Sequence, residues 1–175
     1  MIEAVSAGHR FIMARRAAGI GGPILLTGYS RGAAGVVAIA ARLQRESPAI
    51  NVGAMMLFDC VDRQGDIDAE VIPNNVAYVQ HVIRSPLSGS RESFSNDGLR
   101  YRHPTIFPTA YSFMCTHGGM GGCPWTLGPG QRPTDLIDEG FPDGMTRITF
   151  AGDAAVSSQV WNQCQPFLRT HGFIQ

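Results

Sequence analysis

The sequence predicts one α/β domain, in which helices flank a parallel sheet. Residues 23–27 and 52–58 are uninterrupted apolar runs bounded by turn-forming residues, which is typical of strands buried on both faces. Residues 31–45 lie between these runs and are rich in alanine, which is typical of a helix. Strand, helix and strand within about 35 residues form the βαβ unit of a parallel sheet. The length of 175 residues suits a single domain spanning residues 1–175.

Composition and charge narrow the classes of function. Hydrophobic residues make up 44% of the chain and charged residues 16%, which supplies a core and leaves little surface charge. The 14 basic and 14 acidic residues cancel, so no net field draws the protein to nucleic acid. No apolar run approaches the roughly 18 residues of a membrane-spanning helix, and the N-terminus lacks the basic-then-apolar order of a signal peptide. Localisation therefore stays open between the cytoplasm and export by a dedicated secretion system.

The remaining elements are predicted from hydrophobic spacing and from breaks rich in glycine and proline. Residues 2–18 carry apolar side chains at helical spacing and end at the glycine-rich break that precedes the first strand. The predicted helices and strands alternate along the chain, as in an α/β fold. Beyond the polar loop 59–68, the sequence predicts a short helix over 76–83, strands over 105–113 and 145–150, a closing helix over 154–168, and loops over 85–102 and 118–133.

The residues that indicate chemistry are Gly28-Tyr29-Ser30-Arg31-Gly32, between the first predicted strand and the alanine-rich helix. They match G-x-S-x-G, the turn of α/β-hydrolases that exposes a nucleophilic serine above the sheet. Both glycines are expected to be required, because a side chain at either position would collide with the neighbouring strand or helix. A serine before a helix is also a common N-cap, but the flanking strand and helix favour the nucleophile. We therefore expect an α/β-hydrolase-type sheet with Ser30 as its nucleophile.

A serine hydroxyl is a weak nucleophile and needs a histidine base oriented by a carboxylate, which predicts both partners later in the chain. Asp59 directly follows the apolar run 52–58, and the carboxyl ends of parallel strands meet at one edge of a sheet. Asp62 and Asp66 lie in the same loop and compete with it. This position at a strand end favours Asp59 as the orienting acid.

Spacing alone leaves the base open among three of the five histidines. His117 lies in a glycine-rich loop that is flexible enough to bring an imidazole over the sheet, and His81 and His103 are its alternatives. His9 precedes the serine and breaks the expected order of serine, acid and histidine, while His171 lies near the C-terminus.

The four cysteines, Cys60, Cys115, Cys123 and Cys164, are irregularly spaced and support no disulfide framework. Cys115 and Cys123 lie close to His117 in sequence, but zinc sites usually have two short-spaced pairs of ligands. We therefore expect neither a metal nor another cofactor.

Four segments form a larger pattern: ILLTGYSRGAAGVVAIAARL, LFDCVDRQGD, IPNNVAYVQHVIR with SRESF, and THGGMGG. In this order they resemble the G-[FY]-S-R-G-A turn, the F-D-T-V-G-S segment, the N-V-x-x-x-x-H helix with its trailing R-x-x-F, and the H-S-D-V-G-G segment of an α/β-hydrolase family. That family contains uncharacterised domains and phospholipase effectors of bacterial type VI secretion. The resemblance spans residues 24 to about 122. It implies cleavage of an ester, with lipid as the substrate class, by Ser30 as nucleophile, Asp59 as orienting acid and His117 as base.

The chain also departs from that family. Gly118 and Gly119 stand in place of Ser-Asp, so any role of that aspartate is missing, and residues 111–116 differ from the family's Trp-Phe-Pro-Gly approach. Family members begin with a strand and an Asp-Gly-Thr loop, and α/β-hydrolases draw one oxyanion-hole N–H from an early loop. We therefore expect the chain to be N-terminally incomplete. Only the backbone N–H of Arg31 is then assigned to the oxyanion hole.

Incompleteness opens a second class of function and bears on association. The alternative to an enzyme is a non-catalytic remnant that keeps the serine turn for packing and acts as an interaction domain. Without earlier strands, the apolar runs 23–27 and 52–58 would lie near an open edge of the sheet. We therefore expect self-association through that edge.

Overall fold

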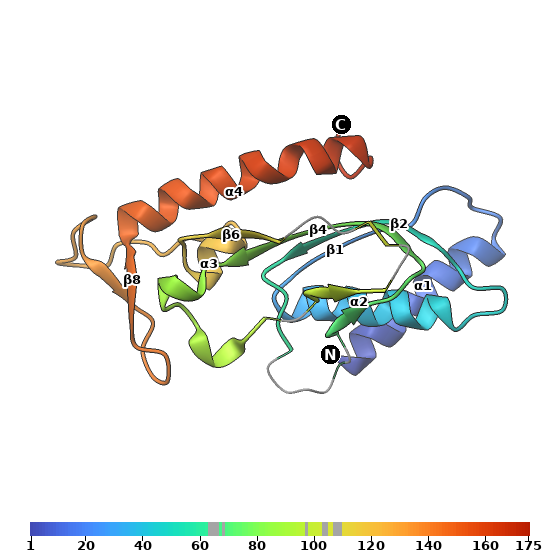
Figure 1. Cartoon of the computed structure of the whole chain (residues 1–175), viewed down its shortest axis with the longest axis horizontal. Helices are drawn as coiled ribbons and strands as arrows, with labels where there is room; N and C mark the ends of the chain where they lie inside the picture. The colour runs from blue at the N-terminus through green and yellow to red at the C-terminus, as the bar shows by residue number, and fades with distance from the viewer. Residues whose placement is uncertain (63–66, 68, 97, 103–104, 107–109) are drawn as a thin grey trace.

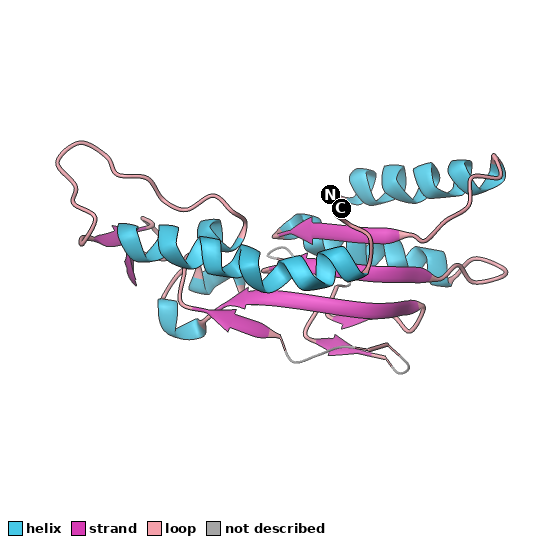
Figure 2. Cartoon of the chain, turned by 90° about the horizontal axis from the view of Figure 1, so that it is seen from above, coloured by secondary structure: helices cyan, strands magenta, loops and turns pink. Residues whose placement is uncertain are grey.

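Four parallel strands form the main sheet of the described residues, with helices on both faces (Figures 1 and 2). The computed structural model describes residues 1–62, 67, 69–96, 98–102, 105–106 and 110–175. Helices α1 (Ile2–Ala17) and α2 (Arg31–Gln44) cover one face of the sheet, and α4 (Phe150–Thr170) covers the other (Figure 1). In spatial order, the strands are β1 (Leu25–Tyr29), β2 (Val52–Phe58), β4 (Val76–Arg84) and β6 (Tyr111–Phe113).

Smaller elements lie around the main sheet. Two short parallel strands, β3 and β5, pair with each other, and β7 and β8 form an antiparallel pair that leads directly into α4. The short helix α3 follows β6. The bounds are β3 (Val71–Ile72), β5 (Arg100–Tyr101), α3 (His117–Met120), β7 (Leu136–Asp138), β8 (Met145–Thr149), and two 3₁₀ turns (Pro86–Ser88 and Glu92–Phe94).

The predicted βαβ unit is confirmed. The second apolar run forms β2 over the expected residues, while the first strand begins and ends two residues later than predicted. β1 and β2 pair in parallel, with Leu25 opposite Ala54 and Tyr29 opposite Phe58. The predicted helices 2–18 and 31–45 correspond to α1 and α2, each shorter by one residue. The coarse prediction of an α/β fold with a parallel sheet therefore holds.

The predicted helix over 76–83 is wrong, because these residues belong to strand β4. β4 lies between β2 and β6 and pairs with both in parallel. Both faces of β4 are buried. Val79 packs in the core on the α2 face of the sheet, and Val82 packs in the core on the α4 face. β-branched residues such as these favour strands, and burial on both faces removes the alternation that marks a half-exposed strand. The resembling N-V-x-x-x-x-H segment is therefore not helical in this chain.

The later predictions are partly correct. The strand expected over 105–113 is reduced to β6, with an isolated bridge between Ile106 and Tyr78, and residues 107–109 lie outside the described part. The strand expected over 145–150 is β8, and the closing helix is longer than predicted at both ends. The expected loop 118–133 begins within α3, and the expected loop 85–102 contains both 3₁₀ turns and β5.

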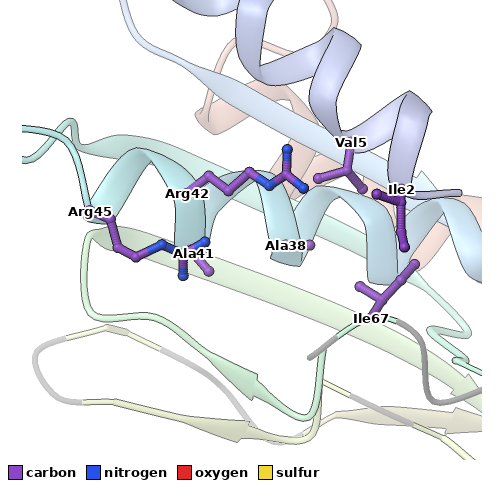
Figure 3. A pocket seen from close by; sticks show the side chains of 7 residues that line it. All are labelled: Ile2, Val5, Ala38, Ala41, Arg42, Arg45 and Ile67. Carbon is purple, nitrogen blue, oxygen red and sulfur yellow. The ribbon is translucent and has the colours of Figure 1, made fainter.

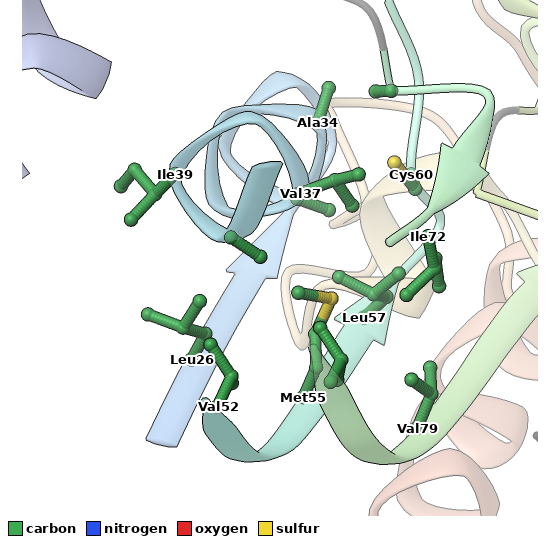
Figure 4. Close-up of a cluster of buried hydrophobic side chains, with 14 of the residues drawn as sticks. Leu26, Ala34, Val37, Ile39, Val52, Met55, Leu57, Cys60, Ile72 and Val79 are labelled. Carbon is green, nitrogen blue, oxygen red and sulfur yellow. The ribbon is translucent and has the colours of Figure 1, made fainter. Parts of the chain in front are cut away.

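The core has a main layer on each face of the sheet. On the α2 face, Ala34, Val37, Met55, Leu57 and their neighbours form a buried cluster (Figure 4). On the α4 face, a smaller cluster joins β2 and β4 to helix α4 and includes Met56, Val82, Cys115, Val160 and Cys164. Because both layers are tied to the same strands, they fix the carboxyl ends of β1, β2 and β4, where the candidate site is found.

Candidate active site

Ser30 occupies a strained turn between β1 and α2. Its backbone has φ 57° and ψ −131°, a left-handed φ that non-glycine residues rarely adopt. The Ser30 N–H donates to the carbonyl of Phe58 at 2.9 Å, which ties the turn to the end of β2. The turn therefore presents the serine at the carboxyl edge of the sheet, in the geometry described for G-x-S-x-G.

The two glycines of the motif differ in what they require. A Cβ at Gly28 would lie 2.5 Å from the carbonyl oxygen of Gly32 and 2.6 Å from the nitrogen of Ala33, so β1 and α2 approach too closely for a side chain. A Cβ at Gly32 would meet no atom within 4 Å. The expectation that both glycines prevent collisions is therefore wrong for Gly32, which lies at the second position of α2 and faces open space.

The structure brings Ser30, His117 and Asp59 together from three distant parts of the chain. His117 Nε2 lies 2.9 Å from Ser30 Oγ, and His117 Nδ1 lies 2.6 Å from Asp59 Oδ2. Asp59 is fully buried and His117 is 8% exposed. An ionised carboxylate only accepts hydrogen bonds, so the Nδ1 proton is donated to Asp59 and Nε2 is left to accept from the serine hydroxyl. That is the tautomer a histidine needs in order to act as a base toward Ser30.

Asp59 is held by more partners than His117 alone. Its Oδ2 accepts from Arg84 Nη1 at 2.6 Å, and its Oδ1 accepts from Asn96 Nδ2 at 2.7 Å and from the Arg84 N–H at 3.1 Å. Burial raises the pKa of Asp59, but the His117 hydrogen bond and the Arg84 charge outweigh it and hold that pKa below its ordinary value. Asp59 therefore remains a carboxylate at neutral pH.

Arg84 is a member of the site that the sequence prediction missed. Its side chain is 5% exposed, and its guanidinium donates to three backbone carbonyls, those of Ser90, Arg91 and Ser95, in addition to Asp59. These bonds connect the end of β4 to the segment that contains Asn96. The signal was an arginine at the end of an apolar stretch, but its position at a sheet edge was hidden because that stretch was assigned to a helix.

A buried carboxylate on α4 fixes the loop that precedes His117. Asp153 is fully buried; its Oδ1 accepts from the Thr116 N–H at 2.7 Å, and its Oδ2 accepts from Thr116 Oγ1 at 2.9 Å and from the Trp125 N–H at 3.0 Å. A Cβ at Gly119 would lie 2.5 Å from Asp153 Oδ1, so the carboxylate occupies the space beside that glycine. The Thr116 hydroxyl in turn accepts from the Gly119 N–H and caps α3.

A second series of side-chain hydrogen bonds holds the His117 backbone. Ser90 Oγ accepts from the His117 N–H at 2.8 Å and donates to Glu139 Oε1 at 2.9 Å. Glu139 also accepts from the Arg91 N–H at 2.7 Å. Because Glu139 directly follows β7, the β7–β8 pair contributes to the placement of the histidine.

Two aromatic rings surround the His117 imidazole. The Tyr29 ring stacks on it with centroids 4.8 Å apart and planes 29° apart, and Phe94 meets it edge-on at 5.2 Å and 85°. The Tyr29 hydroxyl donates to the His117 carbonyl at 2.9 Å. Burial and the Asp59 charge raise the pKa of Tyr29, so the phenol keeps its proton and remains a donor. Rings in these positions limit rotation of the imidazole.

The other residues considered from the sequence lie elsewhere. Asp62 Oδ2 accepts from the Ile67 N–H at 2.7 Å, while Asp66 and His103 lie outside the described residues. His81 is fully buried in β4, where its Nε2 accepts from the Cys60 N–H at 3.1 Å.

His9 pairs with Glu46, and His171 contacts Phe167 at the end of α4. Within the described residues, no group of three or more histidine, cysteine or acidic side chains is arranged to hold a metal. The four cysteines all lie in the described ranges and form no disulfide.

Arg31 is the first residue of α2, so its backbone N–H lies at the N-terminal end of that helix, next to Ser30. Backbone N–H groups at a helix N-terminus attract negative charge. The expectation that the Arg31 N–H forms part of an oxyanion hole is consistent with this position and stays a prediction.

Hollows occur on both sides of the sheet. One of them, the groove beside Tyr29, has a volume of about 220 Å³ and lies between α4 and the ends of β1 and β2. Another of about 180 Å³ lies between α1 and α2, where Figure 3 shows the Arg42 side chain extending toward Val5. Arg42, which lines this second hollow, donates from Nη1 to Ser6 Oγ at 2.8 Å. The residues that line this hollow do not include Ser30, His117 or Asp59.

No family model matches the chain, and no curated protein matches it significantly. None of the helices in the described part of the chain is both long enough and apolar enough to cross a membrane.

Proposed function

We propose that the protein is a serine hydrolase of the α/β-hydrolase type that cleaves an ester through Ser30, His117 and Asp59. The observation that carries this proposal is the unbroken hydrogen-bond chain from Ser30 Oγ through the imidazole to the Asp59 carboxylate, with Ser30 in a left-handed turn between a strand and a helix. Lipid is the proposed substrate class because of the four resembling segments. The groove beside Tyr29 is consistent with an apolar substrate.

In the proposed reaction, Ser30 Oγ attacks the ester carbonyl carbon while His117 Nε2 takes the serine proton. The carbonyl oxygen becomes an oxyanion, which the Arg31 N–H at the start of α2 stabilises. The bond to the alcohol oxygen then breaks, and His117 returns the proton to that oxygen, so an alcohol leaves and an acyl-serine remains. Water, deprotonated by His117, hydrolyses the acyl-serine and regenerates the enzyme with a free acid.

Asp59 and Arg84 have separate parts in this proposal. Asp59 holds the Nδ1 proton, and its charge stabilises the imidazolium that forms while Ser30 attacks. Arg84 fixes Asp59 through two hydrogen bonds and lowers its pKa, which keeps the carboxylate ionised. Arg84 is thus a positioning residue in the proposal, because its contacts are with Asp59 and not with the reacting atoms.

Labelling with a fluorophosphonate probe tests the proposal, because the probe reacts with an activated serine and needs little substrate specificity. The wild-type chain should be labelled, and Ser30→Ala should not be labelled while its circular dichroism spectrum stays unchanged. Ser158→Ala, at an exposed serine of α4, is the matched control and should be labelled like wild type. Equal labelling of wild type and Ser30→Ala, or no labelling of either, would instead support the non-catalytic remnant.

A further inference from the structure

An apolar groove of about 220 Å³ lies beside Tyr29, the residue that precedes the candidate nucleophile. Three of its lining residues belong to α4, which covers the face of the sheet opposite α1 and α2 (Figure 1). Its walls come from Tyr29 and Phe58 at the ends of β1 and β2, from residues 120–122 after the short helix α3, and from Ser157, Val160 and Trp161 of α4. Because most of these side chains are apolar, the groove suits a hydrocarbon chain and offers little to a charged ligand.

The groove lies on the histidine side of Ser30. Tyr29, which precedes the serine, is a shared wall, because its ring stacks on His117 and also lines the groove. Gly121 and Gly122 follow His117 by only a few residues and form a second wall. A Cβ at Gly121 would lie 2.7 Å from the Tyr29 ring, so the absence of a side chain there brings this wall against Tyr29.

The path of the proton indicates whether the acid half or the alcohol half of an ester lies toward the groove. The oxygen of the leaving alcohol must come within reach of His117 Nε2 in order to receive its proton. In the proposed reaction the oxyanion is stabilised by the Arg31 N–H at the start of α2, and α2 and α4 cover opposite faces of the sheet (Figure 1). The alcohol part of the ester is therefore directed toward the groove walls next to His117. We propose that the groove binds the alkyl chain of the alcohol half of the substrate, an inference that rests on the proposed function.

The apolar lining of the groove predicts how the rate depends on the length of that chain. Each methylene that becomes buried in the groove raises kcat/KM about fourfold, and the gain ends where the chain leaves the groove. We therefore expect esters of longer unbranched alcohols to be preferred over ethyl esters.

Two series of esters test the inference. In the first, the acid is acetate and the alcohol is lengthened from ethanol through butanol and hexanol to octanol; in the second, the alcohol is ethanol and the acid is lengthened in the same way. We expect kcat/KM to rise along the alcohol series from ethanol and to level off once the alkyl chain extends beyond the groove. In Ser157→Phe, which fills the groove, the ratio of kcat/KM for hexyl acetate to that for ethyl acetate should fall roughly tenfold or more.

Ser158→Phe is the matched control, because the neighbouring serine of α4 is exposed and does not line the groove. Its hexyl-to-ethyl ratio should equal that of wild type. If Ser157→Phe does not fold, as judged by circular dichroism, Trp161→Ala replaces it, and removal of that wall should weaken the preference for hexyl acetate by at least threefold.

The outcomes separate this inference from the proposed function. A chain that is labelled by fluorophosphonate and hydrolyses ethyl acetate, but shows no alcohol-length preference, overturns the groove assignment alone. So does an effect of Ser157→Phe on the acid series in place of the alcohol series, because the groove would then hold the acyl chain. A chain with neither labelling nor hydrolysis overturns both.

Discussion

The two sides of the candidate site are built in different ways. On the nucleophile side, the backbone does the positioning: Ser30 has a left-handed φ, and the close approach of β1 and α2 leaves no space for a side chain at Gly28. On the base side, side chains from distant segments do it: Asp153, Ser90 and Tyr29 hold the loop and ring of His117. A turn that depends on backbone conformation can be recognised from a short sequence motif. A loop held by side chains from distant segments has no such motif.

The largest effect is expected where the two sides meet, at Asp59. Asp59→Asn keeps the shape but removes the charge that selects the Nδ1 tautomer of His117 and balances Arg84. By analogy with other serine triads, the rate of labelling or ester hydrolysis should fall by about 10⁴-fold. The competing acid provides the control: Asp62→Asn should label at the wild-type rate, because Asp62 accepts from Ile67. A larger loss in Asp62→Asn than in Asp59→Asn would show that the acid is wrongly assigned.

On the nucleophile side, an alanine at one glycine of the motif should destabilise the protein, whereas an alanine at the other should not. Gly28→Ala places a Cβ 2.5 Å from a backbone oxygen that a rigid strand and helix hold in place, and should lower the free energy of unfolding by about 3 kcal/mol or more. Gly32→Ala meets nothing and adds a good helix former to α2, so it should leave stability unchanged or raise it by up to about 1 kcal/mol. Urea unfolding of both variants gives the comparison, and equal losses would contradict the difference between the glycines.

A buried histidine near Asp59, His81, makes the stability of the protein depend on pH. Burial lowers the pKa of His81 to about 4, although the Asp59 charge opposes this. Between that value and the ordinary pKa of about 6.5, the unfolded chain binds a proton that the folded chain does not. Stability should therefore fall as pH drops from about 6.5 toward 4, by about 3 kcal/mol from this group.

Denaturant unfolding across that pH window measures the effect. His81→Gln keeps an acceptor for the Cys60 N–H and removes the titration, so its stability curve should be flatter than that of wild type. His171→Gln is the control for the other histidine whose burial lowers its pKa, and it should flatten the curve less, because His171 is partly exposed. Parallel curves for wild type and His81→Gln would contradict the assignment.

On the base side, Asp153→Asn should weaken catalysis more than binding. An amide cannot accept all three hydrogen bonds that Asp153 receives, so one donor near Thr116 loses its partner and His117 is held less firmly. We expect kcat to fall 10- to 100-fold with little change in KM, and stability to fall by about 2 kcal/mol. Asp138→Asn, at an exposed carboxylate of β7, is the control. A rise in KM at unchanged kcat would show that Asp153 does not position the base.

These differences explain what the sequence could and could not predict. Ser30 and the acid at the end of β2 are identified by adjacency to one strand and one helix, which a short window contains. Arg84 was missed because β4 is buried on both faces and its apolar run was read as a helix. Asp153 lies one residue before the predicted start of the closing helix, and its partners are 28 and 37 residues away. No local pattern records contacts at such separations, so the bracing of His117 becomes visible only in the folded chain.

The smallest expected effect concerns a single hydrogen bond on the base side. Tyr29→Phe keeps the ring that stacks on His117 and removes only the hydroxyl that donates to the His117 carbonyl at 2.9 Å. A neutral hydrogen bond contributes about 1 kcal/mol, so labelling should slow by about fivefold or less, and Tyr111→Phe at an exposed position should have no effect. Because burial and Asp59 raise the pKa of Tyr29, its hydroxyl stays protonated, and the ratio of wild-type to variant rates should be constant from pH 6 to pH 9. A ratio that changes with pH would mean that the Tyr29 hydroxyl transfers a proton, and positioning of His117 would then not be its role.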